Sequence, residues 1–370
     1  MHLSIQQRNT QSNIQNFNHR PWSIHLCRLK SSSCTKIPRD RGKHNEKKCA
    51  FIIPYYGHFP NYFQVFLKTC GANPDYDWLI FTDDHTPYDY PENVHVHYEA
   101  FTDMQQRAQR HFDFPISLST PYKLCDFKPT YGLLFEEYLT NYTHWGHCDC
   151  DVVFGQLNCF ITDAMLDDYD KLFTQGHCTI YKNTPSVNRA FMLPLNGEEI
   201  YKTVFSHNRA FTFDESYLPT NVNRVFEQNG LKIFKPDLSA NTDSRSNIFR
   251  LTHYDAALDV YMTEAKLRAV YVWDNGTLTR SYFRLGEFKQ RELMYMHLQR
   301  RAMKVDTAIL TKNRFKIIPG LFTSLEVDRI TVDNFHQIKY KNHTNHQWRL
   351  FKSDICFWEK RIINRLLPPR

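Results

Sequence analysis

Two apolar runs joined by a helical pattern constrain the fold of this chain more than any other feature. The first run is Cys49–Pro54 and the second is Trp78–Asp84, which ends in two carboxylates. Between them, apolar residues recur at helical spacing, which predicts a helix over about 60–71. A strand, a helix and a strand at this spacing form a right-handed crossover with parallel strands. The chain therefore predicts an α/β fold with a mostly parallel central sheet flanked by helices.

Polar groups follow both strands at the points where the strands end. The loop after the first strand begins with Pro54, Tyr55 and Tyr56, and the second strand ends in Asp83 and Asp84. In open parallel sheets, ligands bind beyond the carboxyl ends of the strands. We therefore expect these residues to form the bed for a nucleotide, with a carboxylate accepting from ribose hydroxyls or a base N–H. Capping of a helix or a turn is the alternative role for the two carboxylates.

The rest of the chain continues as short strands and helices. Alternation over 94–98 predicts an edge strand, and Asn275-Gly276 predicts a tight hairpin turn between two strands over 269–278. Further elements are expected at these positions: helical structure over 101–140 with its main helix over about 129–139, a helix over 157–166, strands over 171–174 and 177–181, and a helix over 220–228. Alternating residues over 292–301 place His297 on one face with Leu293, Tyr295 and Gln299.

A carboxylate pair, Asp149 and Asp151, lies at the end of a strand expected from His144 onward. Residues i and i+2 of a strand point to the same side, so both carboxylates can face one ligand. Carboxylate oxygens are suitable ligands for a divalent cation such as Mg²⁺ or Mn²⁺, which can in turn hold a diphosphate. A polar loop entering a buried strand is the alternative, because Asp-x-Asp triplets are common. The position of the triplet in the chain must decide between the two.

Other charged residues cluster near expected helix starts. Lys123 and Lys128 precede the helix expected from Pro129, and helix N-termini favour anions. A surface ion pair with Asp126 is the alternative for these lysines. A second acidic pair, Asp214 and Glu215, lies just ahead of the helix expected over 220–228.

The net charge of +7 divides into three unequal parts. Residues 1–48 hold 10 basic and 2 acidic residues (+8), residues 49–306 hold 24 and 32 (−8), and residues 307–370 hold 12 and 5 (+7). An acidic body argues against nucleic-acid binding, which needs a basic face on the folded domain. We expect a disordered basic leader over 1–48, a catalytic domain over 49–306 and a small basic appendage over 307–370. In the appendage, Ile355, Trp358, Ile362 and Leu366 predict an amphipathic helix that either contacts a membrane surface or packs on the domain.

Cysteine usage and hydropathy bear on the compartment. The 10 cysteines form no Cys-x-x-Cys pair, and several lie within apolar segments, as free buried thiols do. No apolar stretch approaches the roughly 18 residues of a membrane span. We therefore expect a cytoplasmic protein, with peripheral contact at the inner face of the cell membrane through its basic C-terminal end.

Taken in order, these segments resemble glycosyltransferases of the GT-A fold, and most of all a bacterial group encoded with capsule and surface-polysaccharide genes. The segments that carry the resemblance are 52–62, 78–84, 121–137, 144–155 and 295–301, and it covers about 49–306. It implies a Rossmann-like sheet and transfer of a sugar from a nucleotide-sugar donor, foremost a UDP-sugar. The implied acceptor is a saccharide or a lipid-linked saccharide in surface polysaccharide or lipopolysaccharide biosynthesis.

The resemblance also implies roles for single residues. Asp149 and Asp151 match the metal-binding DxD motif, although Cys150 is an uncommon middle residue, and His297 matches a late histidine that completes the metal or diphosphate site. Asp83 and Asp84 match positions that contact the nucleotide. Asp214 or Glu215 matches the acidic residue that meets the acceptor and acts as base if configuration inverts. Apart from the resemblance, the charge of a diphosphate needs nearby cations, and the candidates to neutralise it are Lys123, Lys128, Arg300 and Arg301.

Two alternatives remain open on the sequence. A sugar nucleotidyltransferase shares a nucleotide-binding sheet, but it needs a glycine-rich basic loop after the first strand, and residues 54–60 contain none. A non-catalytic carbohydrate-binding protein agrees with the 15% aromatic content but leaves three acidic clusters unexplained. Inversion or retention of configuration is not decided by the sequence.

Overall fold

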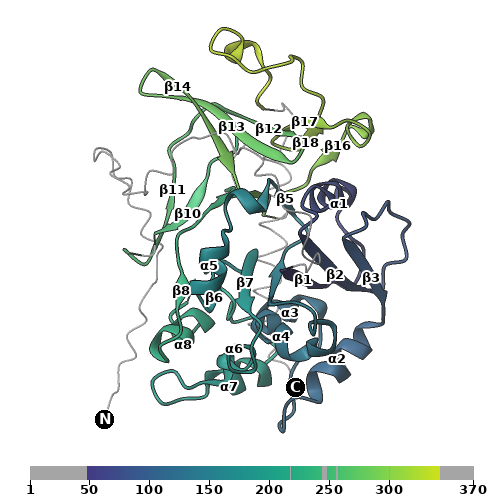
Figure 1. The fold of residues 1–370 in the computed structure, drawn as a ribbon, viewed down its shortest axis with the longest axis vertical. Helices are drawn as coiled ribbons and strands as arrows, with labels where there is room; N and C mark the ends of the chain where they lie inside the picture. The colour runs from purple at the N-terminus through teal and green to yellow at the C-terminus, as the bar shows by residue number, and fades with distance from the viewer. Residues whose placement is uncertain (1–47, 217, 244–247, 256, 300, 342–370) are drawn as a thin grey trace, which may run out of the picture. The chain divides into compact units, whose positions relative to one another are not determined.

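The computed structural model describes residues 48–216, 218–243, 248–255, 257–299 and 301–341 (Figure 1). Three predictions lie outside these residues: the leader up to residue 47, Arg300, and the amphipathic helix near the C-terminus. The division of the chain at 48/49 and 306/307 stays a prediction.

A seven-stranded sheet, ordered β3-β2-β1-β4-β7-β6-β8, forms the centre of the fold. Its strands are β1 Cys49–Pro54, β2 Tyr76–Thr82, β3 Val94–Tyr98, β4 His144–Cys148, β6 Lys171–Leu172, β7 Cys178–Lys182 and β8 Ile233–Phe234. The four strands from β3 to β4 are parallel, and β7 runs antiparallel to both of its neighbours. The predicted α/β class with a mostly parallel sheet is confirmed, and β3 lies at one edge of the sheet, as predicted.

Helices cover both faces of this sheet, which explains why β1 and most of β2 are continuous apolar runs. Alternate residues of β1 enter opposite clusters: Phe51 and Ile53 pack toward helix α1 (Phe63–Gly71), whereas Ala50 and Ile52 pack toward the opposite face. On the first face, the rings of Phe51 and Trp78 stack with centroids 5.5 Å apart.

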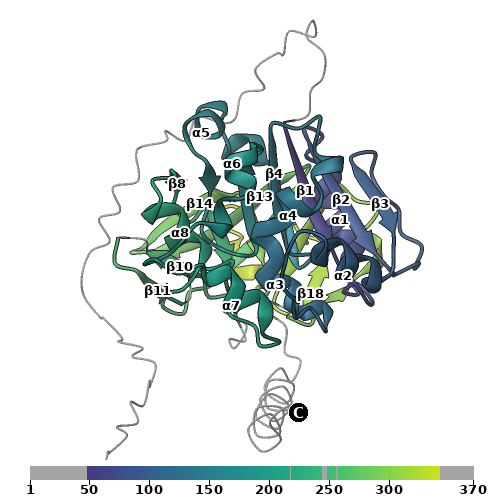
Figure 2. The ribbon, with the colours of Figure 1, turned by 90° about the horizontal axis from the view of Figure 1, so that it is seen from below.

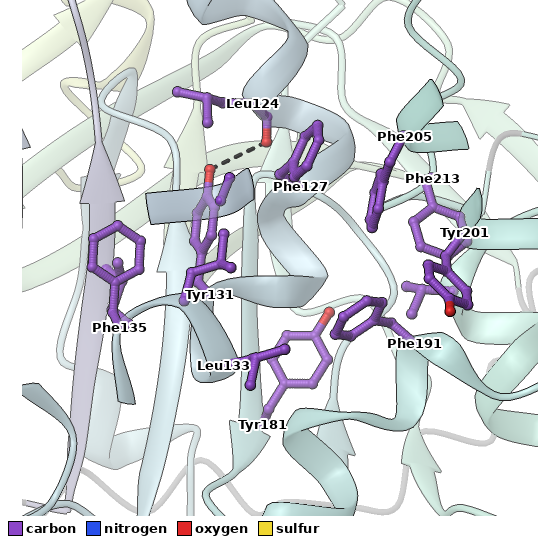
Figure 3. Packing of buried hydrophobic residues seen from close by; sticks show 14 of the residues in the cluster. Leu124, Phe127, Tyr131, Leu133, Phe135, Tyr181, Phe191, Tyr201, Phe205 and Phe213 are labelled. Carbon is purple, nitrogen blue, oxygen red and sulfur yellow. Dashed lines mark hydrogen bonds between the residues drawn. The ribbon is translucent and has the colours of Figure 1, made fainter. Parts of the chain in front are cut away.

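The opposite face is built from aromatic side chains of the segments 124–135 and 181–213 (Figure 3). The rings of Phe127 and Phe205 stack with centroids 4.3 Å apart. The hydroxyl of Tyr131 is also buried there, and it donates to the Leu124 carbonyl at 3.1 Å. Figure 2 looks onto this helical layer, in which α4 (Tyr131–Leu134) lies over β4.

The single helix expected over about 129–139 is wrong. In its place the chain makes a series of short helical turns: η1 Pro121–Lys123, α3 Leu124–Phe127, η2 Lys128–Thr130, α4 Tyr131–Leu134 and η3 Glu136–Tyr138. Pro129 has no N–H and therefore cannot continue the α-helical bonding of α3. Gly132 packs its bare backbone against the indole of Trp145, and this contact leaves no room for a Cβ.

The other helices are short. They are α2 Phe101–Gln109, η4 Leu157–Cys159, α5 Asp163–Asp168, α6 Pro185–Asn188, η5 Ala190–Met192, α7 Ile200–Ser206, α8 Val222–Gln228, η6 Thr307–Ile309 and η7 Phe335–Gln337. The helix expected over 220–228 is therefore confirmed as α8, whereas the helix expected over 157–166 is divided into η4 and α5.

A second sheet of six strands, ordered β14-β13-β12-β17-β18-β16, follows the central sheet in the chain. Its strands are β12 Ala269–Asp274, β13 Thr277–Arg284, β14 Glu287–Leu293, β16 Lys304–Val305, β17 Arg314–Ile318 and β18 Leu321–Thr323. The predicted hairpin turn between β12 and β13 is confirmed. Asn275 and Gly276 both have positive φ, 47° and 89°, as a type I′ turn requires.

Two small sheets complete the fold. One is β5-β15-β9, formed by Val152–Phe154, Tyr295–His297 and Ser239–Asn241. The other is the β10–β11 hairpin, formed by Thr252–Asp255 and Val260–Thr263. The first of these sheets brings His297 beside Val152, and so beside the Asp149–Asp151 turn that precedes β5.

Candidate metal centre and active-site cavity

A cavity of about 720 Å³ opens at the carboxyl ends of β1 and β4. This is the edge at which open parallel sheets bind ligands. Ten of the predicted site residues line it: Pro54, Tyr55, Tyr56, Lys128, Asp149, Asp151, Asp214, Glu215, His297 and Arg301. The fold thus gathers residues from five separate parts of the chain around one space.

Asp149, Asp151 and His297 form a possible metal-binding group in this cavity. One ligand atom from each residue lies within 4.8 Å of the other two. The Nε2 atom of His297 is 3.3 Å from Asp151 Oδ1 and 3.9 Å from Asp149 Oδ2. Backbone pairing fixes this approach, because β15 pairs with β5 and the Leu298 N–H donates to the Asp151 carbonyl at 2.9 Å. Two carboxylates and one imidazole are a donor set suited to Mn²⁺ or Mg²⁺.

Asn241 fixes the orientation of the His297 ring. Its Oδ1 lies 3.0 Å from His297 Nδ1 and also accepts from Gln299 Nε2 at 2.9 Å. Because an amide oxygen only accepts, Nδ1 carries the proton and Nε2 faces the two carboxylates. Burial lowers the pKa of His297, but Asp151 and Asp149 outweigh burial and raise the pKa above its usual value. The ring thus presents to the carboxylates the nitrogen that a metal would use.

Lys128 joins the two acidic clusters. Its Nζ atom lies 2.8 Å from Asp149 Oδ1, 2.9 Å from the Gly176 carbonyl and 3.2 Å from Asp214 Oδ2. Burial lowers the pKa of Lys128, but the carboxylates of Asp149 and Asp214 outweigh burial and hold it well above its usual value. The ammonium is therefore charged, and its three hydrogens face three acceptors.

Asp214 is a buried carboxyl group with an unusual proton affinity. Burial raises its pKa to about 7, against the attraction of Lys128 and with further increases from Glu215 and Asp149. Gly176 lies directly against this acidic pair, so that a Cβ at this position would overlap Asp214 Oδ2 and lie 2.7 Å from Glu215 Cγ. A carboxyl group that titrates near neutral pH can exchange protons with a bound ligand.

Three predicted binding residues do not line the cavity. Asp83 accepts from the Gly57 N–H at 2.6 Å, and Asp84 accepts from Phe59 N–H and Thr86 N–H, both at 3.0 Å. These two carboxylates thus hold the loop after β1 and the turn after β2. Lys123 is buried and donates to Asp126 at 2.7 Å; the partner is the one named in the alternative, but the ion pair lies in the interior and not at the surface.

Gly176, Asn241 and His177 belong to this site but were not predicted from the sequence. His177 Nδ1 lies 2.7 Å from the Tyr295 hydroxyl, and its ring packs on His297 with centroids 4.3 Å apart. Burial, His297 and Lys128 together hold the pKa of His177 well below its usual value, so the ring is neutral. None of the three residues stands in a recognisable motif, and only strand pairing and loop packing bring them to the site.

Cysteine pairing and membrane spans were also predicted from the sequence. The cysteines within the described residues, among them Cys148 and Cys150 beside the metal-binding group, are free thiols. Cys150 is buried in the apolar cluster that contains Phe51 and Trp78. Among the described residues, no helix has the length and apolar character needed to cross a bilayer.

Comparisons with known proteins give a family. No curated protein matches the chain. One similar solved structure is a galactosyltransferase, LgtC, in complex with donor and acceptor sugar analogues. The two sequences are 8% identical, the match covers 52% of this chain and 75% of the galactosyltransferase chain, and the TM-score is 0.29. That TM-score is too low to assign a shared fold. The model of a family of unknown function, DUF6625, matches residues 51–326, and the chain therefore belongs to this family.

Proposed function

We propose that the protein is a metal-dependent glycosyltransferase that uses a nucleotide-sugar donor. The observation that carries the proposal is the convergence of Asp149, Asp151 and His297 in the cavity at the carboxyl end of β4. The resemblance of the ordered motifs to GT-A glycosyltransferases supports it. The family itself has no stated activity, so the chemistry of the cavity carries the assignment.

The charges of the cavity support a requirement for a cation. Four carboxylates line it, from Asp149, Asp151, Asp214 and Glu215, whereas its lysine and arginine side chains are Lys128 and Arg301. Lys128 is already engaged by Asp149 and Asp214. A diphosphate would therefore meet net negative charge unless a divalent cation accompanied it.

The donor set of Asp149, Asp151 and His297 fits such a cation, and Asn241 keeps the imidazole in the ligating tautomer. When bound, a divalent cation offsets the charge that accumulates on the leaving diphosphate. Arg301 lines the same cavity and its Nη2 donates to the Asp243 carbonyl at 2.6 Å, so its guanidinium is held in place in the cavity wall.

Deprotonation of the acceptor hydroxyl is the second chemical task. Asp214 or Glu215 serves as general base if the reaction inverts configuration, and positions the acceptor if it retains configuration. The pKa of about 7 for Asp214 agrees with base chemistry at neutral pH, because a general base works best when its pKa is near the operating pH.

The finer parts of the proposal come from the resemblance. They are a UDP-sugar as donor and a saccharide or lipid-linked acceptor in surface polysaccharide biosynthesis. The preference for Mn²⁺ over Mg²⁺ comes from the histidine among the ligands. The basic C-terminal end agrees with work at the inner face of the cell membrane, next to a lipid-linked acceptor.

The test is metal-dependent release of a nucleoside diphosphate from a panel of nucleotide sugars, with Mn²⁺, Mg²⁺ or EDTA. Calorimetry with UDP in the presence and absence of Mn²⁺ measures binding separately from turnover. Asp151→Asn should abolish both, whereas Asp113→Asn, an exposed carboxylate outside the cavity lining, should leave both unchanged.

Three outcomes of these experiments would contradict the proposal. Release of pyrophosphate in place of nucleoside diphosphate would identify a nucleotidyltransferase. Carbohydrate binding with no nucleotide binding under any metal condition would identify a non-catalytic protein. Wild-type turnover by Asp151→Asn would remove the metal-binding role from this residue.

A further inference from the structure

The loop that carries the second acidic pair has an unusual backbone conformation. It follows α7 and includes Thr212, Asp214 and Glu215, all of which line the cavity. Thr212 has a φ of +53°, in the left-handed region that β-branched residues seldom occupy. Such conformations persist only where surrounding contacts impose them, and they concentrate at functional sites.

Asp126 supplies those contacts from beneath the loop. Its carboxylate is fully buried and accepts from the Phe211 N–H at 2.9 and 3.1 Å and from the Phe213 N–H at 3.0 Å. These are the two amides that flank Thr212. One carboxylate therefore bonds the backbone on both sides of the left-handed residue.

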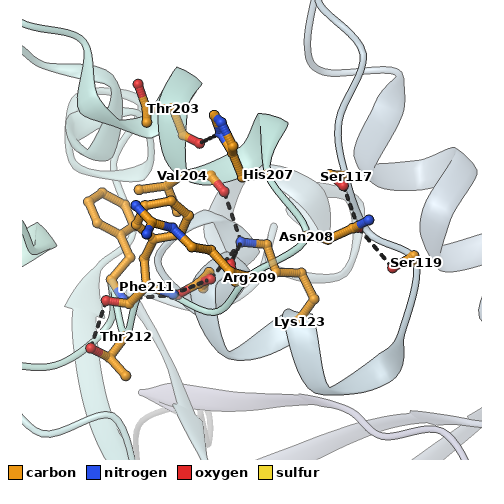
Figure 4. A network of polar contacts seen from close by, with 12 residues as sticks. Ser117, Ser119, Lys123, Thr203, Val204, His207, Asn208, Arg209, Phe211 and Thr212 are labelled. Atoms are coloured by element: carbon orange, nitrogen blue, oxygen red, sulfur yellow. Dashed lines mark hydrogen bonds and ion pairs between the residues drawn. The ribbon is translucent and has the colours of Figure 1, made fainter. Parts of the chain in front are cut away.

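Lys123 completes the arrangement. Its Nζ atom donates to Asp126 Oδ2 at 2.7 Å. It also donates to the Val204 carbonyl and to the Arg209 carbonyl, both at 2.8 Å (Figure 4). All three ammonium hydrogens are thus used within the protein. The ion pair connects the η1–α3 segment to the end of α7 and to the start of the loop.

The position of the ion pair argues for a role beyond stability. Buried ion pairs are weak evidence for stability, because apolar residues of similar volume often do as well or better. Here the paired groups bond the backbone of one loop, and that loop presents Asp214 to Lys128 at 3.2 Å. On its other side, Asp214 packs against the bare backbone of Gly176.

We propose that Lys123 and Asp126 are a positioning pair that holds Thr212 in its left-handed conformation and thereby fixes Asp214 and Glu215 in the cavity. This inference rests on the proposed function for its catalytic consequence. The structural part of the inference, that the Asp126 carboxylate holds the amides on both sides of Thr212, does not depend on any activity.

The first variant is Asp126→Asn, which replaces one carboxylate oxygen with an N–H donor that must face Phe211 N–H, Phe213 N–H or Lys123 Nζ. Its matched control is Asp77→Asn. Asp77 is a buried carboxylate at the amino end of β2 that accepts from the Tyr142 hydroxyl at 2.7 Å.

A second pair of variants leaves the Lys123–Asp126 ion pair unchanged, so the test remains valid even if Asp126→Asn does not fold. Thr212→Gly permits a positive φ, whereas Thr212→Pro forbids it because the proline ring holds φ near −65°.

Hydrogen exchange of the 211–213 amides is the readout that needs no activity. Asp126→Asn and Thr212→Pro should raise exchange at Phe211 and Phe213 at least tenfold, and Asp77→Asn should leave it at the wild-type rate. In turnover, Asp126→Asn and Thr212→Pro should lower kcat at least tenfold, with KM for the donor and Kd for Mn²⁺ within twofold of wild type. Thr212→Gly should be at least fivefold more active than Thr212→Pro.

Three results would overturn the proposal. The first is wild-type exchange at Phe211 and Phe213 in both Asp126→Asn and Thr212→Pro. The others are equal activity of Thr212→Gly and Thr212→Pro, and a loss of Mn²⁺ affinity as large as the loss of kcat. If wild-type protein turns over no donor, the proposed function fails by itself. The exchange rates then still decide whether Asp126 positions the loop.

Discussion

Gly176→Ala tests whether the acidic pair must approach the backbone closely. The φ of Gly176 is not in the left-handed region, so alanine is compatible with its backbone and the substitution adds only volume. The added Cβ would overlap Asp214 Oδ2 and lie 2.7 Å from Glu215 Cγ, whereas ordinary contact begins at 3.4 Å. Glu215 must therefore retreat by about 0.7 Å, the difference between these distances, and Asp214 must move further.

This displacement removes Asp214 from Lys128, which is 3.2 Å away in the wild type. A hydrogen bond between charged groups contributes about 1.5–3 kcal/mol, so we expect the free energy of unfolding to fall within that range. Misplacement of reacting groups by about 1 Å lowers a rate by roughly 100-fold, so kcat should fall by about that factor. The affinity for Mn²⁺ should fall much less than kcat, because Asp149, Asp151 and His297 lie on other segments and only Asp149 is linked to Asp214, through Lys128.

Urea denaturation, calorimetric Mn²⁺ titration and donor turnover give the three quantities. Gly197→Ala is the control, because Gly197 has a φ of +83° and open space around it. That control should lose stability through backbone strain but keep kcat. Wild-type kcat in Gly176→Ala, or a loss of Mn²⁺ affinity as large as the loss of kcat, would refute the reasoning.

Three further predictions concern single residues. Asn241→Ala should weaken Mn²⁺ binding by roughly 10- to 100-fold in calorimetry, because the outer partner of a ligating histidine fixes its tautomer; unchanged affinity would remove this role. Burial lowers the pKa of Lys171 to about 7, so above that pH the unfolded state binds more protons than the folded state. The free energy of unfolding of wild type, relative to that of Lys171→Met, should therefore rise by about 1.4 kcal/mol from pH 8 to pH 9. A difference between the two proteins that does not change with pH would contradict this. Gly146→Ala should destabilise the fold by about 1–3 kcal/mol in urea, since its Cβ would lie 2.6 Å from the Thr179 carbonyl oxygen; wild-type stability would show that the sheet yields at this point.

Much of the central sheet follows from local sequence. The runs that become β1 and β2 are largely apolar on both faces, and Pro54 and Asp83 lie at their ends; β4 is buried but contains His144 and His147, and Asp149 follows it. Strand ends and tight turns depend on neighbouring residues, so a reading of the sequence can locate them. The same local signals place the Asp149–Asp151 pair at the ligand-binding edge of the sheet and the hairpin turn at Asn275-Gly276.

The helical segment after residue 120 was less predictable. Its apolar pattern agrees with one helix from Pro129, but Gly132 packs directly on Trp145 and Phe135 leaves the helical conformation, with φ −124° and ψ 26°. The apolar pattern indicates which residues are buried, but it does not indicate how closely the backbone packs against a neighbouring side chain. Tertiary packing therefore divided this segment into several short helical turns.

The sequence by itself determined the kinds of groups available to the site and the strand ends that carry several of them. Tertiary structure alone decided how those groups are used: Lys123 is buried beneath a loop with Asp126, whereas Lys128, five residues later, joins Asp149 to Asp214 in the cavity. It also brought Asn241 to His297 across 56 residues of chain. The reason is physical. A lysine near a helix N-terminus has the same local sequence whether it meets solvent, phosphate or a carboxylate, and only long-range pairing of strands and loops determines which partner lies within hydrogen-bond distance.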